Sequence, residues 1–182
     1  AGEAPEGVGV QHVDVRDGDA VAQAVAAAAE AMGGLNVLVN CAGIATGEKV
    51  LGRDGPHALD SYQRTIDINL VGSFNVARLA AEKMAEAPAG PDGQRGVIVN
   101  TASIAAFDGQ KGQAAYASSK AGIAGLSLPM ARDLARSGIR VMAIAPGTFL
   151  TPMLEGLGQE IIDGLAADVT FPKRLGDPTD FA

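Results

Sequence analysis

The chain has 182 residues, 47% of them hydrophobic, which is enough to bury one core and is typical of a single domain. Its 14 basic and 21 acidic residues give a formal net charge of −7, and neither sign forms the block that a nucleic-acid-binding surface requires. A lone cysteine, Cys41, and two separated histidines exclude an internal disulfide and a structural zinc site, so we predict no metal and favour a cytoplasmic or similarly reducing compartment.

The first half of the chain alternates predicted strands and helices. Residues 8–15 alternate apolar and polar side chains, which predicts a strand, and the alanine-rich run 19–32 predicts a helix. Residues 36–39 form a short apolar run typical of a buried strand. A loop rich in glycine and proline, 46–56, then leads to a long predicted helix over residues 59–87.

The second half continues the alternation. We predict a strand at 96–102, a helix at 113–136 and a strand at 138–145. Right-handed crossovers between such strands give a doubly wound parallel sheet of the α/β class, with helices on both faces and one domain over residues 1–182. Ligands of these sheets bind beyond the carboxyl ends of the strands, where this chain places small and polar residues.

Tyr116 and Lys120 are four residues apart in the predicted helix 113–136, so their side chains share one face. An ammonium group beside a phenol favours the phenolate and suits the phenol to proton transfer. The pair alone is weak, because such residues on a helix surface are more often simply solvated. Ser103 follows the predicted strand 96–102, where its hydroxyl is suited to bind a substrate oxygen, although a turn role is the plainer interpretation.

These residues, taken in order with residues 40–43, Asn69 and 146–147, resemble the short-chain dehydrogenase/reductase family, whose members have a Rossmann-like fold. The resemblance implies that Tyr116 is the general acid/base and that Ser103 holds the substrate oxygen. It also implies that Lys120 binds the nicotinamide ribose and lowers the pKa of Tyr116. It also assigns Asn69 to a proton path that leads to Lys120.

The same resemblance implies a cofactor site. Its residues are Asp14 and Val15 beside the adenine ring, Asn40, Cys41, Ala42 and Gly43 in the loop after the second predicted strand, Pro146, Gly147, Phe149 and Thr151 after the last one, and Tyr116 and Lys120. Cys41 stands where the family has a second asparagine, and we interpret it as a packing residue.

Three stretches, 94–103, 112–116 and 171–178, resemble one subgroup of the family, the type-2 3-hydroxyacyl-CoA dehydrogenases, also called type-10 17β-hydroxysteroid dehydrogenases. This subgroup resemblance implies NAD as cofactor and an acyl-CoA or other apolar alcohol or ketone as substrate. The family resemblance implies a homotetramer, with residues 59–87 and 113–136 as the candidate interfaces. It also places Gln113 with Ser103 and Tyr116 at the substrate. No membrane or nucleic-acid partner is expected.

Two family features are not found in this sequence. The glycine-rich phosphate loop should precede Asp14, and a further strand should follow residue 182. We therefore expect a domain that lacks its N-terminal βαβ unit and its last strand, as a truncated, cleaved or partial form of a longer parent. Hence an alternative stays open, in which the chain is a non-catalytic scaffold or partner subunit that retains unused catalytic residues.

Overall fold

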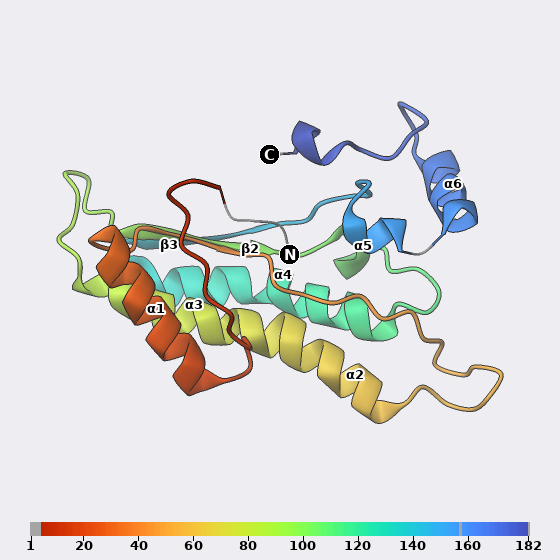
Figure 1. The fold of residues 1–182 in the computed structure, drawn as a ribbon, viewed down its shortest axis with the longest axis horizontal. Coiled ribbons are helices and arrows are strands. Elements are labelled where there is room, and N and C mark those ends of the chain that lie inside the picture. Colours follow the sequence, from red (N-terminus) through yellow and green to blue (C-terminus); the bar gives the residue numbers. More distant parts are fainter. Residues whose placement is uncertain (1–4, 157, 182) are drawn as a thin grey trace. The chain divides into compact units, whose positions relative to one another are not determined.

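The computed structural model describes residues 5–156 and 158–181 of the chain. It divides into two compact units, Ala1–Ile144 and Ala145–Ala182, which are described separately below. Figure 1 shows the course of the chain through its helices and strands.

The first unit is built on a three-stranded sheet in the order β1-β2-β3. Its strands are β1 (Val37–Asn40), β2 (Gly96–Thr101) and β3 (Ile139–Ile144). Both pairings are parallel, so all the carboxyl ends meet at one edge. The predicted strands at 36–39, 96–102 and 138–145 are confirmed to within a residue or two.

The first unit has three long helical segments, of which α1 packs on α3, and α3 and α4 pack on the sheet. The helix α1 (Gly18–Met32) begins at Asp17, whose carboxylate caps two backbone N–H groups, and ends at Gly33, which has a left-handed φ of 71°. The predicted helix 59–87 consists of α2 (Leu59–Ile66), a π-helical turn η1 (Asp67–Val71) and α3 (Gly72–Glu86). The helix α4 (Ala114–Leu134) confirms the prediction for 113–136.

The helices of the first unit lie on one side of its sheet (Figure 1). Side chains on the opposite side, such as Val37, Val39 and Met142, are exposed. Within the described part of this unit, one of the two helical layers expected for a doubly wound sheet is therefore present.

The prediction of a strand over residues 8–15 is wrong. These residues have irregular backbone, and Val8 and Val10 are exposed. An extended segment becomes a strand only by pairing with a neighbour, and in the described chain these residues pair with none of the three strands. The alternation of side chains indicates that the segment is suited to a sheet, but it does not indicate whether a neighbouring strand is present.

One apolar cluster fills the space between the helices and the sheet. Its buried members are Leu35, Ala77, Ala80, Ala81, Met84, Ile98, Met130, Ile139 and Val141. The approach of α3 to β2 depends on Gly96, because a Cβ there would lie 2.6 Å from the Met84 Sδ and 2.9 Å from the Asn36 carbonyl oxygen. Gly96 thus leaves the space that the Met84 side chain fills at the amino end of β2.

The second unit contains α5 (Pro152–Glu155), α6 (Gln159–Asp168) and a 3-10 turn, η4 (Pro178–Asp180). Gly176 organises this unit, since its N–H donates to the Thr148 carbonyl and its own carbonyl accepts from the Leu150 N–H. A Cβ at Gly176 would lie 2.5 Å from the ring of Phe149, so a larger residue there would displace that ring.

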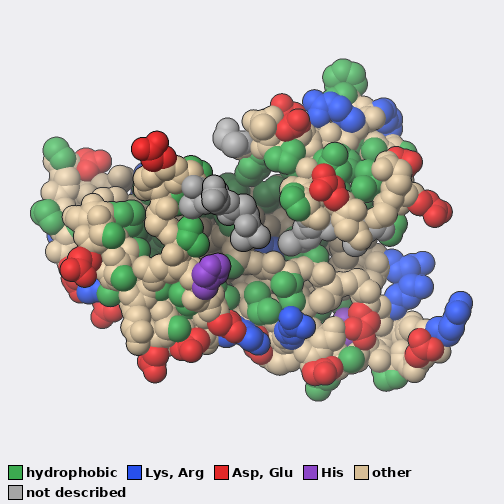
Figure 2. All heavy atoms as spheres, in the orientation of Figure 1, with side chains coloured by type: hydrophobic (Ala, Val, Ile, Leu, Met, Phe, Trp, Pro, Cys, Tyr) green, Lys and Arg blue, Asp and Glu red, His purple; other side chains and the backbone are tan. Residues whose placement is uncertain are grey.

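The surface shows mixed charge. On the face drawn in Figure 2, acidic and basic side chains are interspersed rather than gathered by sign. Among the helices of the described residues, none has the length and apolar character needed to cross a membrane.

Candidate functional site

Two buried asparagine amides join the carboxyl ends of β1 and β2. Asn40 and Asn100 are partners in the strand register. The Asn40 Nδ2 donates to the Asn100 Oδ1 at 2.8 Å and to the Ser73 carbonyl at 3.1 Å. The pair fixes the point at which the chain leaves β1 for the loop 41–44.

Asn69 holds that loop. It lies in the π-helical turn η1 and is 0% exposed. Its Oδ1 accepts from the Ile44 N–H at 2.8 Å, and its Nδ2 donates to the Ile44 carbonyl at 2.9 Å and to the Ser119 hydroxyl at 3.0 Å. Single π turns of this kind are frequent at functional sites, because they turn one side chain out of the helical register.

The Lys120 ammonium is buried at the same place. Its side chain is on α4, the residue is 6% exposed, and its Nζ donates to the Thr101 carbonyl at 2.7 Å. Burial lowers the pKa of Lys120 below its ordinary value. The Nζ is 5.7 Å from the centre of the Tyr116 ring, so the structure brings this predicted pair together.

Gly43 brings the backbone of the loop 41–44 close to Asn69 and Lys120. A Cβ at Gly43 would lie 3.2 Å from the Asn69 Oδ1 and 3.8 Å from the Lys120 Nζ. The absence of a side chain leaves backbone facing these polar groups, which is the close approach that a bound cofactor requires. Cys41, two residues earlier, is exposed, and its sulfur lies 3.6 Å from the Thr101 hydroxyl.

Ser103 follows β2 and is nearly buried. Its Oγ accepts from the Ala105 N–H at 3.1 Å and so caps the short 3-10 turn η2 (Ile104–Ala106), which packs against α4. The turn role that the sequence suggested is therefore present, and it leaves the hydroxyl proton free to donate. Gln113 precedes α4, and its side-chain oxygen accepts from the Gln110 N–H at 2.9 Å.

Asp14 and Val15 precede α1 and are held by different partners. The Asp14 carboxylate forms an ion pair with Arg16 at 2.6 Å. Its hydrogen bonds with the Arg16 side chain, and then with the Arg16 backbone, lower the pKa of Asp14 to about 2. The Val15 carbonyl accepts from the Asn75 Nδ2 at 2.9 Å, and the Val15 side chain occupies the space that Gly72 leaves open.

The remaining predicted cofactor residues belong to the second unit. Pro146 and Gly147 open it, and Thr151 precedes α5. Phe149 packs edge-on against Phe181, with ring centres 5.2 Å apart. The structure thus fixes Phe149 within its own unit.

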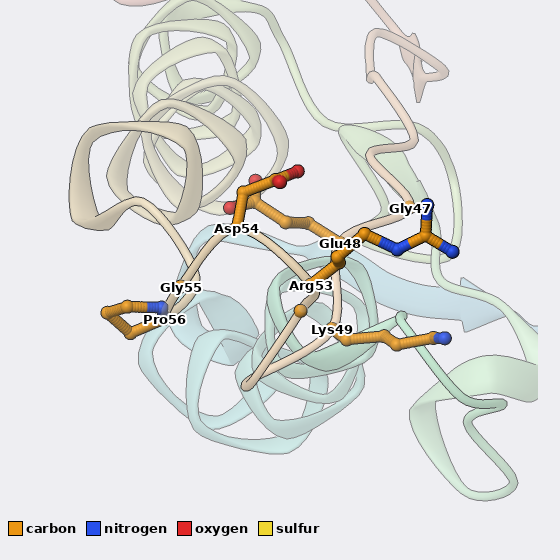
Figure 3. A pocket seen from close by; sticks show the side chains of 8 residues that line it. Gly47, Glu48, Lys49, Arg53, Asp54, Gly55 and Pro56 are labelled. Carbon is orange, nitrogen blue, oxygen red and sulfur yellow. The ribbon is translucent and has the colours of Figure 1, made fainter.

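A surface hollow of about 370 Å³ lies in the loop between β1 and α2, among residues 47–49 and 52–56 (Figure 3). The Glu48 carboxylate anchors it by accepting from the Ala58 N–H at 2.6 Å, and this bond lowers the pKa of Glu48. None of the predicted site residues lines the hollow. Among the described residues, no group of three or more histidine, cysteine or acidic side chains is placed to hold a metal ion.

Sequence reasoning missed three partners of the site. Ser119, the Thr101 carbonyl and the backbone of Ile44 hold Asn69 and Lys120 in place. Ser119 stands within the stretch Tyr116 to Lys120, which was a signal, but the two backbone groups have no signature in a sequence.

The sequence of this chain is similar to those of known dehydrogenases. The family model described as short chain dehydrogenase matches residues 2–162. A human 3-hydroxyacyl-CoA dehydrogenase type-2 is 52% identical over 171 residues, which are 93% of this chain and 66% of that protein. A human (3R)-3-hydroxyacyl-CoA dehydrogenase is 37% identical over 147 residues, covering 81% of this chain and 52% of the relative.

A solved structure agrees with these matches. The crystal structure of 3-hydroxyacyl-CoA dehydrogenase type-2 from Mycobacterium avium superposes with a TM-score of 0.84 at 43% identity, over 93% of this chain and 66% of the other. The chain therefore spans about two thirds of the length of its type-2 relatives. The resemblance that the motifs indicated is confirmed.

Proposed function

The chain belongs to the short-chain dehydrogenase family, and on that premise we propose that it carries the catalytic centre of an NAD-dependent oxidoreductase. The reaction interconverts a secondary alcohol and a ketone. The proposal takes both compact units as parts of one dinucleotide-binding domain.

The observation that carries this proposal is the buried Lys120 ammonium beside the Tyr116 ring, with Nζ 5.7 Å from the ring centre. No carboxylate of the described residues forms an ion pair with this ammonium, and a buried unpaired cation is unfavourable for stability, so its presence favours a role in chemistry. In this role Tyr116 takes the proton of the substrate hydroxyl, and Lys120 places a positive charge beside the phenol.

Two further side chains support Tyr116. Ser103 donates its hydroxyl proton to the substrate oxygen, because its Oγ accepts from the Ala105 N–H and its proton is free. Asn69 fixes Ile44 and the loop that faces Lys120, and it is the candidate for a proton path to the ammonium.

The residues present fit a nicotinamide cofactor, because Gly43 leaves backbone open beside Asn69 and Lys120. When bound, the nicotinamide supplies the acceptor or donor of hydride. Lys120 and the loop Asn40 to Gly43 would hold its ribose side, and Asp14 with Val15 its adenine side. By the family resemblance, Pro146, Gly147, Phe149 and Thr151 of the second unit also contact it.

The names of the relatives indicate the substrate class, a 3-hydroxyacyl-CoA or a related apolar hydroxy compound. Ile104 and Phe107, which follow Ser103, expose apolar side chains suited to such a chain. By the resemblance, Gln113, three residues before Tyr116, also contacts the substrate. We also propose a homotetramer. Val71, Phe74 and Leu128 on the helical segments concerned expose apolar surface that subunit contacts would cover.

The alternative is a non-catalytic scaffold, and it is favoured only by the share of the relatives' length that the chain spans. Binding and turnover separate the two. The purified chain is titrated with NADH and with NADPH by fluorescence, and acetoacetyl-CoA is then added while NADH absorbance is followed. Saturable NADH binding with turnover supports the enzyme, whereas a folded sample that binds neither nucleotide supports the scaffold. Tighter binding of NADPH would overturn the choice of NAD.

A further inference from the structure

One chain of hydrogen bonds crosses the candidate site and connects three parts of it. It begins at the backbone of Ile44, which bonds the Asn69 amide through both its N–H and its carbonyl. The Asn69 Nδ2 continues it to the Ser119 hydroxyl at 3.0 Å, and that hydroxyl donates to the Tyr116 carbonyl at 2.7 Å. The Asn69 amide thus joins the loop after β1 to the π turn, and the Ser119 hydroxyl joins Asn69 to α4.

Ser119 completes the bonding of a fully buried amide. Asn69 and Ser119 are both 0% exposed, so water cannot replace a lost partner without entering the core. The Nδ2 has two protons, one taken by the Ile44 carbonyl and the other by Ser119. Since the Ser119 proton points to the Tyr116 carbonyl, its lone pair is the acceptor for Asn69.

We propose that Ser119 is a positioning residue for the reaction, acting through Asn69 on the loop that faces the cofactor. The inference rests on the proposed function and names a further residue that it needs. Without the hydroxyl, one Nδ2 proton loses its acceptor, and the amide plane is no longer fixed. Ile44 and Gly43 are then released from the groups that align them beside Lys120.

The neighbouring serine provides a matched control. Ser118 is exposed, and its hydroxyl donates to the Ala114 carbonyl at 2.7 Å, within its own helix. Replacing it removes one serine hydroxyl from the same turn of α4 and leaves the bonds of Asn69 intact. A general effect on the helix would appear in both variants, whereas a positioning effect appears only at Ser119.

The test uses the full chain as wild type, S119A, S119C and S118A. S119C is slightly larger than serine and so leaves no cavity, but its thiol is a weak hydrogen-bonding group, so it remains informative if S119A does not fold. The first readout is hydrogen exchange of the Asn69 side-chain amide, followed by NMR. The second is the kcat and KM for acetoacetyl-CoA with NADH.

We expect exchange of the Asn69 amide to be faster by about tenfold or more in S119A and S119C, and unchanged in S118A. We expect kcat to fall by about tenfold or more in the Ser119 variants with KM within about twofold, because misalignment acts on the chemical step. Asn69 exchange at the wild-type rate in both Ser119 variants overturns the inference. So does wild-type kcat in a variant whose Asn69 exchanges faster.

If the wild type itself binds nucleotide but turns over no substrate, the proposed function fails on its own account. The exchange readout then still decides whether Ser119 positions Asn69.

Discussion

The two ends of the sheet in the first unit bury different kinds of side chain. At the amino ends of β2 and β3, the cluster around Met84, Ile98 and Ile139 is entirely apolar. At the carboxyl ends, polar side chains are buried beside small apolar ones such as Ala102 and Ala105; the polar ones are Asn40, Asn69, Asn100, Ser103, Ser119 and Lys120. We call these the apolar end and the polar end.

The difference between the two ends shows which part of the unit stabilises the fold and which part is suited to chemistry. Burial of apolar surface contributes about 25 cal/mol for each Å², without any demand on geometry beyond close packing. A buried polar group contributes little net free energy and is costly if it loses its partner. The polar end thus contributes little to the stability of the unit, but it holds polar side chains in fixed positions. The apolar end provides the stability that keeps those side chains in place.

The largest expected effect is on catalysis and comes from the polar end. Tyr116→Phe removes only the hydroxyl that transfers a proton, so turnover should fall by about 10²-fold or more. NADH affinity and the unfolding temperature should change little, since the ring is retained. Steady-state kinetics and a fluorescence titration measure the two. Turnover that stays near the wild-type rate would remove Tyr116 from its assigned role.

The next effect is on stability and comes from the apolar end. Met84 is 0% exposed, and Met84→Ala leaves a cavity that should lower the free energy of unfolding by about 2–5 kcal/mol. Met32→Ala, on α1, is the control, because Met32 is 63% exposed and should change stability little. Urea denaturation measures both. Equal losses in the two variants would contradict the assignment of the core.

A smaller loss is expected where α3 meets β2. Gly96→Ala places a Cβ 2.6 Å from the Met84 Sδ and should cost about 1–3 kcal/mol through overpacking. Gly125→Ala within α4 is the control, since no atom lies within 4 Å of the added Cβ. There alanine should stabilise the helix by about 0.5–1 kcal/mol. Thermal denaturation should move in opposite directions for the two, and a parallel shift would contradict the packing.

The sequence alone predicted the long helices of the first unit and the three strands of its sheet. The spacing of Tyr116 and Lys120 predicted a shared helix face, and the structure places the two groups together. The helical run 59–87 was also right, but its π turn was not foreseen. The side chain of Asn69 in that turn bonds to Ile44, 25 residues earlier, and contacts between segments so far apart leave no periodic pattern in a sequence.

The predicted strand at 8–15 failed for a related reason. Strand formation depends on a neighbour rather than on the segment itself, whereas a helix satisfies its own backbone. Val15 is fixed instead by Asn75 of α3, a contact across 60 residues. The roles of individual site residues remain predictions, since fold and proximity do not by themselves establish a chemical step.

The smallest expected effect concerns Asp14, the proposed adenine partner, which the sequence did not show to be paired with Arg16. The pKa of Asp14 is lowered to about 2 from an ordinary 3.8, so the folded state favours its ionised form. The stability that this ion pair contributes is therefore complete above about pH 4 and is lost as the pH falls toward 2. Arg16→Ala should raise the pKa of Asp14 part of the way back toward 3.8, because the side-chain hydrogen bonds are lost while the backbone N–H of residue 16 still donates, as followed by NMR titration of the carboxyl carbon. Arg140→Ala, which removes an exposed arginine bonded to Gln94, should leave that pKa unchanged. Equal shifts in both variants would show that net charge, rather than the ion pair, sets the ionisation of Asp14.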